Sequence, residues 1–153
     1  MSNLDGKLSL SGKVAVVTGG ARGMGAAHCI ALAAQGASVV VCDVLDVEGA
    51  AVAEQVGGTY LHLDVTSESD WESAVTATEA AYGPINILVN NAGVVGLGRV
   101  DKTELEEWNR IVGINLTGTF LGIRYCADSM KKAGSGVIVN ISSTAGLVGY
   151  CDM

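Results

Sequence analysis

Short apolar runs alternate along the chain with longer segments in which apolar residues recur every three or four positions. The runs consist almost entirely of apolar residues, which is typical of strands buried on both faces of a parallel sheet. The longer segments have the periodicity of helices that place one face against such a sheet. We therefore predict strands at residues 14–17, 38–42, 60–63, 85–89 and 137–141, and helices at residues 23–35, 46–56, 67–82 and 103–132.

Turn and capping residues support these boundaries. Gly36 and Gly57 follow two of the predicted helices, at the place where a left-handed residue often ends a helix. Ser67, with Asp70 three residues later, resembles the capping box that begins a helix. Because strands and helices alternate and crossovers between parallel strands are right-handed, the pattern predicts the α/β class with a doubly wound parallel sheet of the Rossmann type. We expect a single domain over residues 1–153 with the strand order 3-2-1-4-5.

The composition is that of a packed globular domain. Hydrophobic residues make up 49% of the 153 positions and charged residues 16%, which excludes a disordered chain and a coiled coil. The formal net charge is −7 and the longest basic cluster is Lys131-Lys132, so no nucleic acid is expected as a partner. No apolar run approaches the roughly 18–20 residues of a membrane span. Residues 1–12 also lack the apolar core of a signal peptide, so we expect no membrane contact.

Cysteine and histidine residues are not grouped as metal ligands are. No two cysteines have C-x-x-C spacing, which favours buried thiols in a reducing compartment over a disulfide or metal site. His28 and His62 stand alone in a predicted helix and a predicted strand, where a structural role is expected. We therefore expect a cytoplasmic protein without a metal site. The cysteines are Cys29, Cys42, Cys126 and Cys151.

The most informative motif lies between the first predicted strand and the first predicted helix. Residues 18–25 read TGGARGMG, with glycines at Gly19, Gly23 and Gly25. Gly19 allows the tight turn, Gly23 lets the backbone approach a pyrophosphate, and Gly25 lets helix and strand pack closely. The helix that begins here points free N–H groups at the same place. This context favours dinucleotide binding over a glycine-rich turn without a ligand.

Two charged residues near the motif bear on the choice of cofactor. Asp43 ends the second predicted strand, and a carboxylate there accepts hydrogen bonds from both ribose hydroxyls of an adenosine and repels a 2′-phosphate. Arg22 lies beside the glycines and is able to pair with a 2′-phosphate. Because no other basic residue follows Asp43 closely, we predict NAD. Arg22 then faces either the pyrophosphate or Asp43 itself.

Five motifs occur in the order and at the separations of a known family. They are the glycine motif, Asp64-Val65, Asn91-Ala92-Gly93, Asn115 and the segment NISS at residues 140–143. From residue 10 to about residue 149 the chain resembles the short-chain dehydrogenase/reductase family, and within it the bacterial 3α/20β-hydroxysteroid dehydrogenase branch. The resemblance implies NAD(H)-linked interconversion of a secondary alcohol and a ketone, with hydroxysteroids among the candidate substrates. It also implies that the full-length form is a homodimer or homotetramer.

The resemblance implies roles for individual residues. Asp64 would bind the adenine amino group, the Val65 backbone a ring nitrogen, and Asn91 would also fix neighbouring backbone. Asn115 would kink its helix and hold a water of the proton relay; the alternative is a buried asparagine bonded to a neighbouring strand. Ser143, rather than Ser142, would donate a hydrogen bond to the substrate carbonyl. The expected catalytic residues are Ser143 and Asn115, and the expected cofactor-binding residues are Gly19, Arg22, Gly23, Met24, Gly25, Asp43, Asp64, Val65, Asn91, Ala92 and Gly93.

The sequence departs from the family at its C-terminal end. The family's general acid is a Tyr followed four positions later by a Lys that lowers the tyrosine pKa. The only Tyr after Ser143 is Tyr150, whose Lys partner would fall beyond Met153, so we interpret Tyr150 as a loop residue. The chain then corresponds to the first five strands of a seven-stranded domain. Three interpretations remain open: a fragment of a complete enzyme, a truncated and inactive product, or a non-enzymatic dinucleotide-binding module.

An incomplete sheet has consequences for solubility. The strand predicted at residues 137–141 is apolar on both faces and free of charge and proline, which is the profile of an edge prone to association. The helix predicted at residues 103–132 would also lack a packing neighbour. We therefore expect partial exposure of its apolar residues Ile111, Ile114, Leu121 and Ile123.

Overall fold

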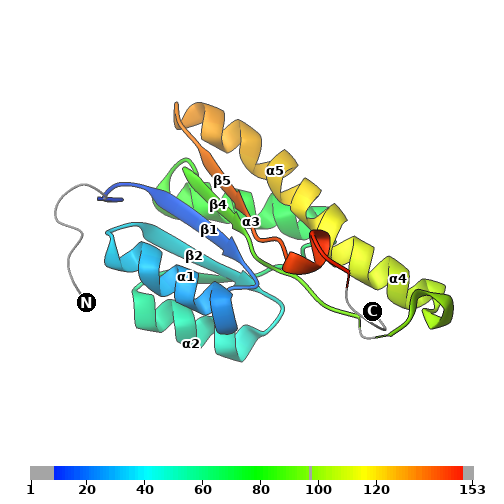
Figure 1. Cartoon of the computed structure of the whole chain (residues 1–153). Coiled ribbons are helices and arrows are strands. Elements are labelled where there is room, and N and C mark those ends of the chain that lie inside the picture. The colour runs from blue at the N-terminus through cyan, green and yellow to red at the C-terminus, as the bar shows by residue number, and fades with distance from the viewer. Residues whose placement is uncertain (1–8, 97, 150–153) are drawn as a thin grey trace.

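A parallel sheet with helices on both faces forms the molecule (Figure 1). The structure is a computed structural model that describes residues 9–96 and 98–149. The strand order is β3-β2-β1-β4-β5, so the predicted fold class and topology are confirmed. The strands are β1 (Val14–Thr18), β2 (Ser38–Asp43), β3 (Thr59–His62), β4 (Ile87–Asn90) and β5 (Val137–Asn140).

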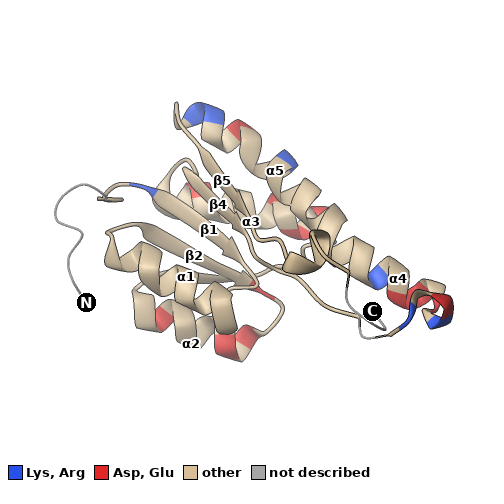
Figure 2. Ribbon diagram, viewed as in Figure 1, with Lys and Arg blue, Asp and Glu red and all other residues tan. Residues whose placement is uncertain are grey.

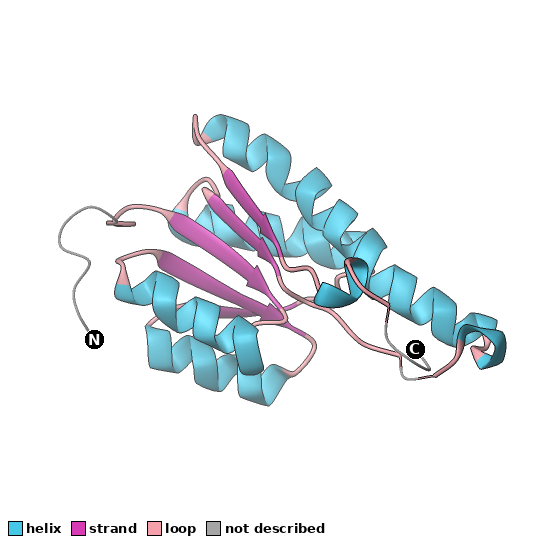
Figure 3. Ribbon diagram, in the orientation of Figure 1, coloured by secondary structure: helices cyan, strands magenta, loops and turns pink. Residues whose placement is uncertain are grey.

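Helices cover the two faces of the sheet in pairs (Figure 3). Helices α1 (Gly23–Ala34) and α2 (Asp46–Val56) pack together on one face, and α3 (Glu68–Tyr82) and α5 (Gly118–Lys132) pack together on the other. Helix α4 (Leu105–Val112) continues into α5 through one π-helical segment, Gly113–Thr117, so the single helix predicted over this region is interrupted. Short 3₁₀ helices lie at Val100–Lys102 and Thr144–Gly146.

The predicted helix ends are built as expected. The Ser67 hydroxyl accepts a hydrogen bond from the Asp70 backbone N–H at 3.2 Å and donates one to the Asp70 carboxylate at 2.7 Å. These bonds satisfy an N–H of the first turn of α3, which has no partner within the helix. At the other end of a helix, Gly57 closes α2 in the left-handed conformation with φ +64°, which a side chain would disfavour.

The alternation of side chains along the strands divides the core in two. Val16 and Val40 face α3 and α5, where they pack around the fully buried indole of Trp71. Val17 and Val41 face α1 and α2 on the opposite side of the sheet. Because both faces are covered, the central strands need apolar residues at every position, which explains the continuous apolar runs in the sequence.

Exposed apolar residues lie at one edge and along one helix face. The side chains of β5 are exposed, as predicted, and Val137 retains 58% of its accessible surface. The prediction for Leu121 is wrong: this residue is 4% exposed, because it points from α5 into the core around Trp71. The exposed apolar residues of α4, α5 and the segment between them are Leu105, Trp108, Leu116 and Phe120.

We predict that the chain of residues 1–153 associates at low micromolar concentration through β5. Its edge carries unpaired backbone groups flanked by exposed β-branched side chains. A Val137→Lys substitution places a charge on this edge and should reduce association, whereas Val47→Lys, at an exposed position on α2, should not. Gel filtration with light scattering measures the association. A wild-type chain that is monomeric, unfolds cooperatively and binds no hydrophobic dye would contradict the prediction.

Candidate functional site

A cavity of about 380 Å³ opens at the carboxyl ends of the strands, beside β1 and β4. The order of the strands reverses at this point, because β2 and β3 follow β1 on one side and β4 and β5 on the other. Open parallel sheets bind their ligands at such a reversal. The cavity is lined by Gly19, Arg22, Met24, Gly25, Asp43, Val44, Leu45, Leu63, Asp64, Val65, Asn91, Ala92, Gly93 and Ile114.

The structure therefore brings together, around one cavity, every predicted cofactor-binding residue except Gly23. The predicted residues come from three separate turns that follow β1, β2 and β4, and from the segment after β3. Sequence reasoning missed four lining residues, Val44, Leu45, Leu63 and Ile114. These four are apolar and carry no motif, so only their sequence neighbours Asp43, Asp64 and Asn115 marked the place.

The glycine-rich loop needs its glycines for different reasons. Gly19 and Gly23 have φ of +61° and +54°, in the left-handed region that other residues rarely adopt. A Cβ on Gly23 would meet nothing within 4 Å, so only its backbone conformation requires glycine. A Cβ on Gly25 would lie 2.0 Å from the Gly19 carbonyl oxygen. Gly25 thus lets the first turn of α1 lie directly against the loop, which leaves the helix N-terminus at the cavity.

Hydrogen bonds join the ends of β1 and β4 beneath the cavity. The Thr18 hydroxyl accepts from the backbone N–H groups of Asn91 and Ala92, both at 3.0 Å. The Asn91 side-chain amide donates to the carbonyl oxygens of Thr18 and Gly19, again at 3.0 Å. The prediction that Asn91 fixes neighbouring backbone is confirmed. Its Oδ1 atom is buried and lacks a hydrogen-bond partner among the residues that the structure describes.

Two backbone N–H groups hold the Asp43 carboxylate in place. One carboxylate oxygen accepts from the Ala21 N–H at 3.0 Å and the other from the Leu45 N–H at 3.1 Å. Each oxygen has a further lone pair for a ligand hydroxyl. The interpretation that Arg22 faces Asp43 is wrong, because the Arg22 guanidinium forms an ion pair with Glu48 in the first turn of α2.

A second group of hydrogen bonds fixes the turn that carries Asp43. The Tyr60 hydroxyl lies 2.7 Å from both the Asp43 carbonyl oxygen and the Asp46 carboxylate. The His62 ring lies 2.6 Å from the same carboxylate, and this contact raises the pKa of His62. The Tyr60 hydroxyl holds the pKa of Asp46 below its usual range. No sequence motif indicates this group, since its side chains come from two separate elements, β3 and α2.

The turn after β3 is anchored to α3. The Asp64 carboxylate accepts from the backbone N–H and the hydroxyl of Thr66, at 2.9 and 2.8 Å. The Val65 carbonyl accepts from the indole N–H of Trp71 at 3.0 Å. Asp64 and Val65 therefore lie at the cavity on a turn whose shape the protein itself sets.

A neighbouring cavity of about 590 Å³ contains the predicted catalytic residues. Asn115 lies in the π-helical segment, where its side chain accepts from the Val94 N–H and donates to the Val94 carbonyl, both at 2.8 Å. The alternative of a buried asparagine bonded to a strand is wrong, because Asn115 is exposed and binds the loop after β4. The cavity is lined by Met24, Asn91, Ala92, Gly93, Val94, Val95, Asn115, Ile141, Ser142, Ser143 and Gly146.

Ser142 and Ser143 both line this second cavity. The Ser143 oxygen accepts from the Ala145 N–H at 3.1 Å, which places the hydroxyl at the start of the 3₁₀ helix Thr144–Gly146. That bond uses a lone pair, so the hydroxyl proton can still be donated to a ligand. The expectations for Tyr150 and Cys151 concern positions that lie outside the described residues.

Among the residues that the structure describes, no cysteine lines either cavity. Cys29, Cys42 and Cys126 are buried free thiols, and burial raises the pKa of Cys29 and of Cys126 to about 12. Over residues 9–96 and 98–149 no group of three or more His, Cys, Asp or Glu side chains is placed to hold a metal ion. Within the same ranges no helix has the length and apolar character needed to span a bilayer.

The sequence and the structure are both similar to those of known proteins. A family model described as short chain dehydrogenase matches residues 13–153. A 3-alpha-(or 20-beta)-hydroxysteroid dehydrogenase of Mycobacterium tuberculosis is 52% identical over 142 residues, which cover 92% of this chain and 55% of that protein. A trans-4-hydroxycyclohexanecarboxylate dehydrogenase of Sinomonas cyclohexanicum is 46% identical over 149 residues, covering 90% of this chain and 57% of the relative.

One more curated relative and one solved structure are also similar to this chain. A cyclopentanol dehydrogenase of Comamonas testosteroni is 49% identical over 142 residues, covering 90% of this chain and 57% of the relative. A crystal structure named as ribose-5-phosphate isomerase from Brucella melitensis 16M superposes with a TM-score of 0.87 at 35% identity, covering 92% of this chain and 56% of that one. The chain thus spans about half the length of the curated relatives that it matches.

Proposed function

Because this chain belongs to the short-chain dehydrogenase family, we propose that it is the cofactor-binding part of an oxidoreductase that interconverts a secondary alcohol and a ketone. The observation that carries the proposal is the cavity where the strand order reverses, with Asp43 and the glycine-rich loop in its wall. The relatives named above act on a hydroxysteroid, a hydroxycyclohexane carboxylate and cyclopentanol. We infer from these names that the substrate is a secondary alcohol on a ring.

The residues around the first cavity fit a nicotinamide adenine dinucleotide, and we propose NAD. Gly23 leaves open space beside the N-terminus of α1, where a pyrophosphate would meet free N–H groups. The buried, unpartnered Oδ1 of Asn91 supplies an acceptor at the same wall. Asp43 offers a fixed carboxylate for the ribose hydroxyls. When bound, the cofactor would accept or donate the hydride of the reaction.

We assign the chemistry of the substrate oxygen to the second cavity. Ser143 would donate its hydroxyl proton to that oxygen and so stabilise the negative charge that develops on it. Asn115 would hold the loop after β4 in the shape that the substrate meets, through its two bonds to Val94. The water of the proton relay that the family resemblance places beside Asn115 is part of this proposal.

A dinucleotide-binding module without turnover is the alternative function. The observation that favours it is the first cavity, whose wall holds the glycine-rich loop and Asp43 without Ser143 or Asn115. An intact-mass measurement on the natural protein separates the two functions. A mass near 15.5 kDa would favour the module, and a clearly larger mass would favour the enzyme.

We also propose an assembly state and a location for the protein. We propose that the full-length protein is a homodimer or homotetramer, which is supported by the exposed apolar side chains of Leu105, Trp108, Leu116 and Phe120. The buried free thiols of Cys29, Cys42 and Cys126 support the proposed cytoplasmic location, because thiols persist in reducing compartments.

We predict that the chain binds NADH more tightly than NADPH, and that Asp43→Ala lowers the NADH affinity about tenfold or more. A hydrogen bond to a charged group contributes about 1.5–3 kcal/mol, and each 1.4 kcal/mol changes an affinity about tenfold. Fluorescence titration with both reduced cofactors measures the effect. Asp128→Asn, an exposed carboxylate on α5 paired with Lys131, is the control and should change neither affinity. Tighter binding of NADPH by the wild type would overturn the prediction.

A further inference from the structure

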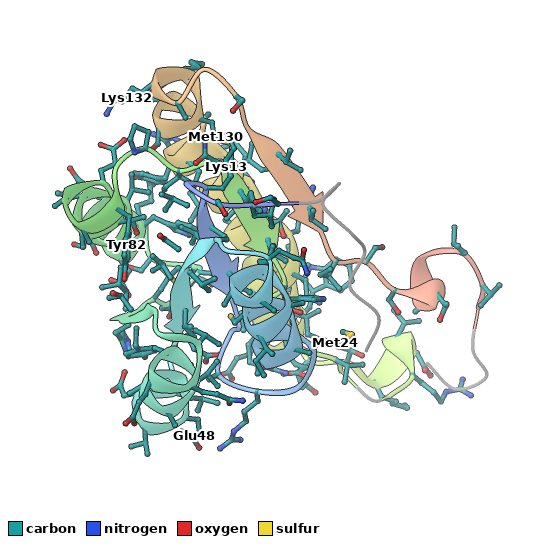
Figure 4. The ribbon with its side chains drawn as sticks, turned by 90° about the vertical axis from the view of Figure 1, so that its left-hand side faces the viewer. Lys13, Met24, Glu48, Tyr82, Met130 and Lys132 are labelled. Carbon is teal, nitrogen blue, oxygen red and sulfur yellow. The ribbon has the colours of Figure 1, made fainter. Side chains whose placement is uncertain are left out.

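An ion pair links the glycine-rich loop to α2 at the edge of the first cavity. Arg22 directly precedes α1 and lines the cavity together with Asp43. Its guanidinium binds the carboxylate of Glu48, in the first turn of α2. The contact holds the pKa of Glu48 below its usual range. The acidic residues at the carboxyl end of β2 and at the start of α2 appear together in red in Figure 2, and Glu48 is labelled toward the outside of α2 in Figure 4.

The ion pair between Arg22 and Glu48 bears on phosphate binding because of where Arg22 lies. A guanidinium beside the glycine-rich loop has the charge and the planar donors to bind a phosphate. Under the proposed function the adenosine ribose lies at Asp43. A 2′-phosphate on that ribose would lie near Arg22, which lines the same cavity. In the structure the Glu48 carboxylate already binds this guanidinium and neutralises its charge. A 2′-phosphate would therefore meet two carboxylates, those of Asp43 and Glu48, and a cation that is engaged elsewhere.

The two carboxylates are held in different ways. Asp43 is fixed by bonds from the backbone of Ala21 and Leu45, so its orientation does not depend on Arg22. Glu48 is held through its side chain by Arg22 alone among the contacts that the structure shows for its carboxylate. Removal of the Glu48 charge would leave Asp43 in place and release Arg22.

We propose that Glu48 is a second residue that determines cofactor specificity, and that it disfavours NADP(H) by holding the guanidinium of Arg22. The inference rests on the proposed function, since it requires that the cavity binds a dinucleotide. Glu48 is a positioning residue in this scheme, because it acts through Arg22. Asp43 selects for the ribose hydroxyls, and Glu48 selects against the phosphate.

The test is a titration of the wild-type chain and three variants, Glu48→Gln, Arg22→Ala and the double variant, at low ionic strength. The probes are NADH, NADPH, 5′-AMP and adenosine 2′,5′-bisphosphate, of which the last two isolate the 2′-phosphate. Glu48→Gln should raise the affinities for NADPH and the bisphosphate about threefold to fivefold, which is the range of an exposed ion pair. The affinities for NADH and 5′-AMP should change by less than about twofold on the same scale.

The variants that lack Arg22 test whether Glu48 acts through the arginine. In Arg22→Ala, the further change Glu48→Gln should raise the NADPH affinity by clearly less than it does in the wild type, because no guanidinium is released. Glu54→Gln removes the same charge from an exposed position about 9 Å further along α2 and is the matched control. It should leave all four affinities unchanged. Thermal unfolding of each variant checks that the fold is retained.

Two results would overturn the inference while leaving the proposed function intact. One is NADH binding by the wild type with no change in the NADPH-to-NADH affinity ratio in Glu48→Gln. The other is an equal gain in the presence and absence of Arg22, which would show a general charge effect. A folded wild-type chain that binds neither cofactor would instead overturn the proposed function, and this inference with it.

Discussion

A chain of residues 1–153 is expected to oxidise no secondary alcohol at a measurable rate, although it binds NADH. The site contains Ser143 and Asn115, but residues 144–153 hold no Tyr–Lys pair to exchange a proton with the alcohol. A positioned acid or base contributes about 10²–10⁴-fold to a rate, and poorer positioning of the substrate lowers the rate further. The absorbance of reduced nicotinamide, with cyclopentanol or a hydroxysteroid as the substrate, measures the rate.

The control for this prediction is a complete relative assayed under the same conditions. The mycobacterial hydroxysteroid dehydrogenase, 52% identical to this chain, is suitable. Turnover by residues 1–153 at a rate comparable to that of the relative would contradict the prediction. It would mean that another group, such as Tyr150, carries out the proton transfer.

Replacement of Gly25 by alanine is expected to reduce the NADH affinity about 100-fold or more, which corresponds to about 2.7 kcal/mol. The new Cβ would lie 2.0 Å from the Gly19 carbonyl oxygen and 2.6 Å from the Asn91 amide nitrogen. Real Cβ atoms do not approach so closely, so either the loop or the first turn of α1 must move. Both belong to the wall of the cavity, and overpacking of this kind also costs about 1–3 kcal/mol of stability. Fluorescence titration and thermal unfolding measure the two effects.

Gly57→Ala is the control variant. It separates the steric clash expected at residue 25 from the stability that is lost when a glycine is replaced. Gly57 has φ +64° at the end of α2, and a Cβ there would meet nothing within 4 Å. This variant should lose stability, because alanine is disfavoured at positive φ, but keep its NADH affinity. An unchanged NADH affinity in Gly25→Ala would show that the loop takes up the extra atom without altering the site.

The fold could be predicted because a local run of apolar residues marks each strand in the sequence. The bounds of α2 agree with the prediction to the residue, and β5 differs at one end only. The larger shift is at β4, predicted from Ile85 and observed from Ile87. Ile85 is buried, but its N–H donates to the Ser129 hydroxyl, and the Asn86 side chain accepts from the Val14 N–H. At Ile85 a bond to a side chain takes the place of a backbone bond to a neighbouring strand, whereas the backbone of Asn86 still bonds to that of Val14 and Val137. Hydropathy does not record this difference.

The motifs in the sequence marked most residues of the cavity wall, but they did not indicate the contacts between elements. The predicted residues of this wall lie in short segments with fixed spacing, which is a pattern that the sequence alone can show. The partners of Arg22 and Tyr60 depend on how α2 lies against the glycine-rich loop and β3. Leu121 was misassigned for a related reason. The helical repeat shows which residues share a face, but the arrangement of α3 and α5 decides which face is inside.

The bonds between Thr18 and Asn91 have a thermodynamic consequence for ligand binding. Two backbone N–H groups and two carbonyl oxygens at the ends of β1 and β4 are satisfied by these two side chains before any ligand arrives. Ordering a loop on binding normally costs conformational entropy, about 1–2 kcal/mol for each residue whose backbone becomes fixed. Here that ordering belongs to folding instead of binding. More of the interaction free energy at this wall is then available as affinity.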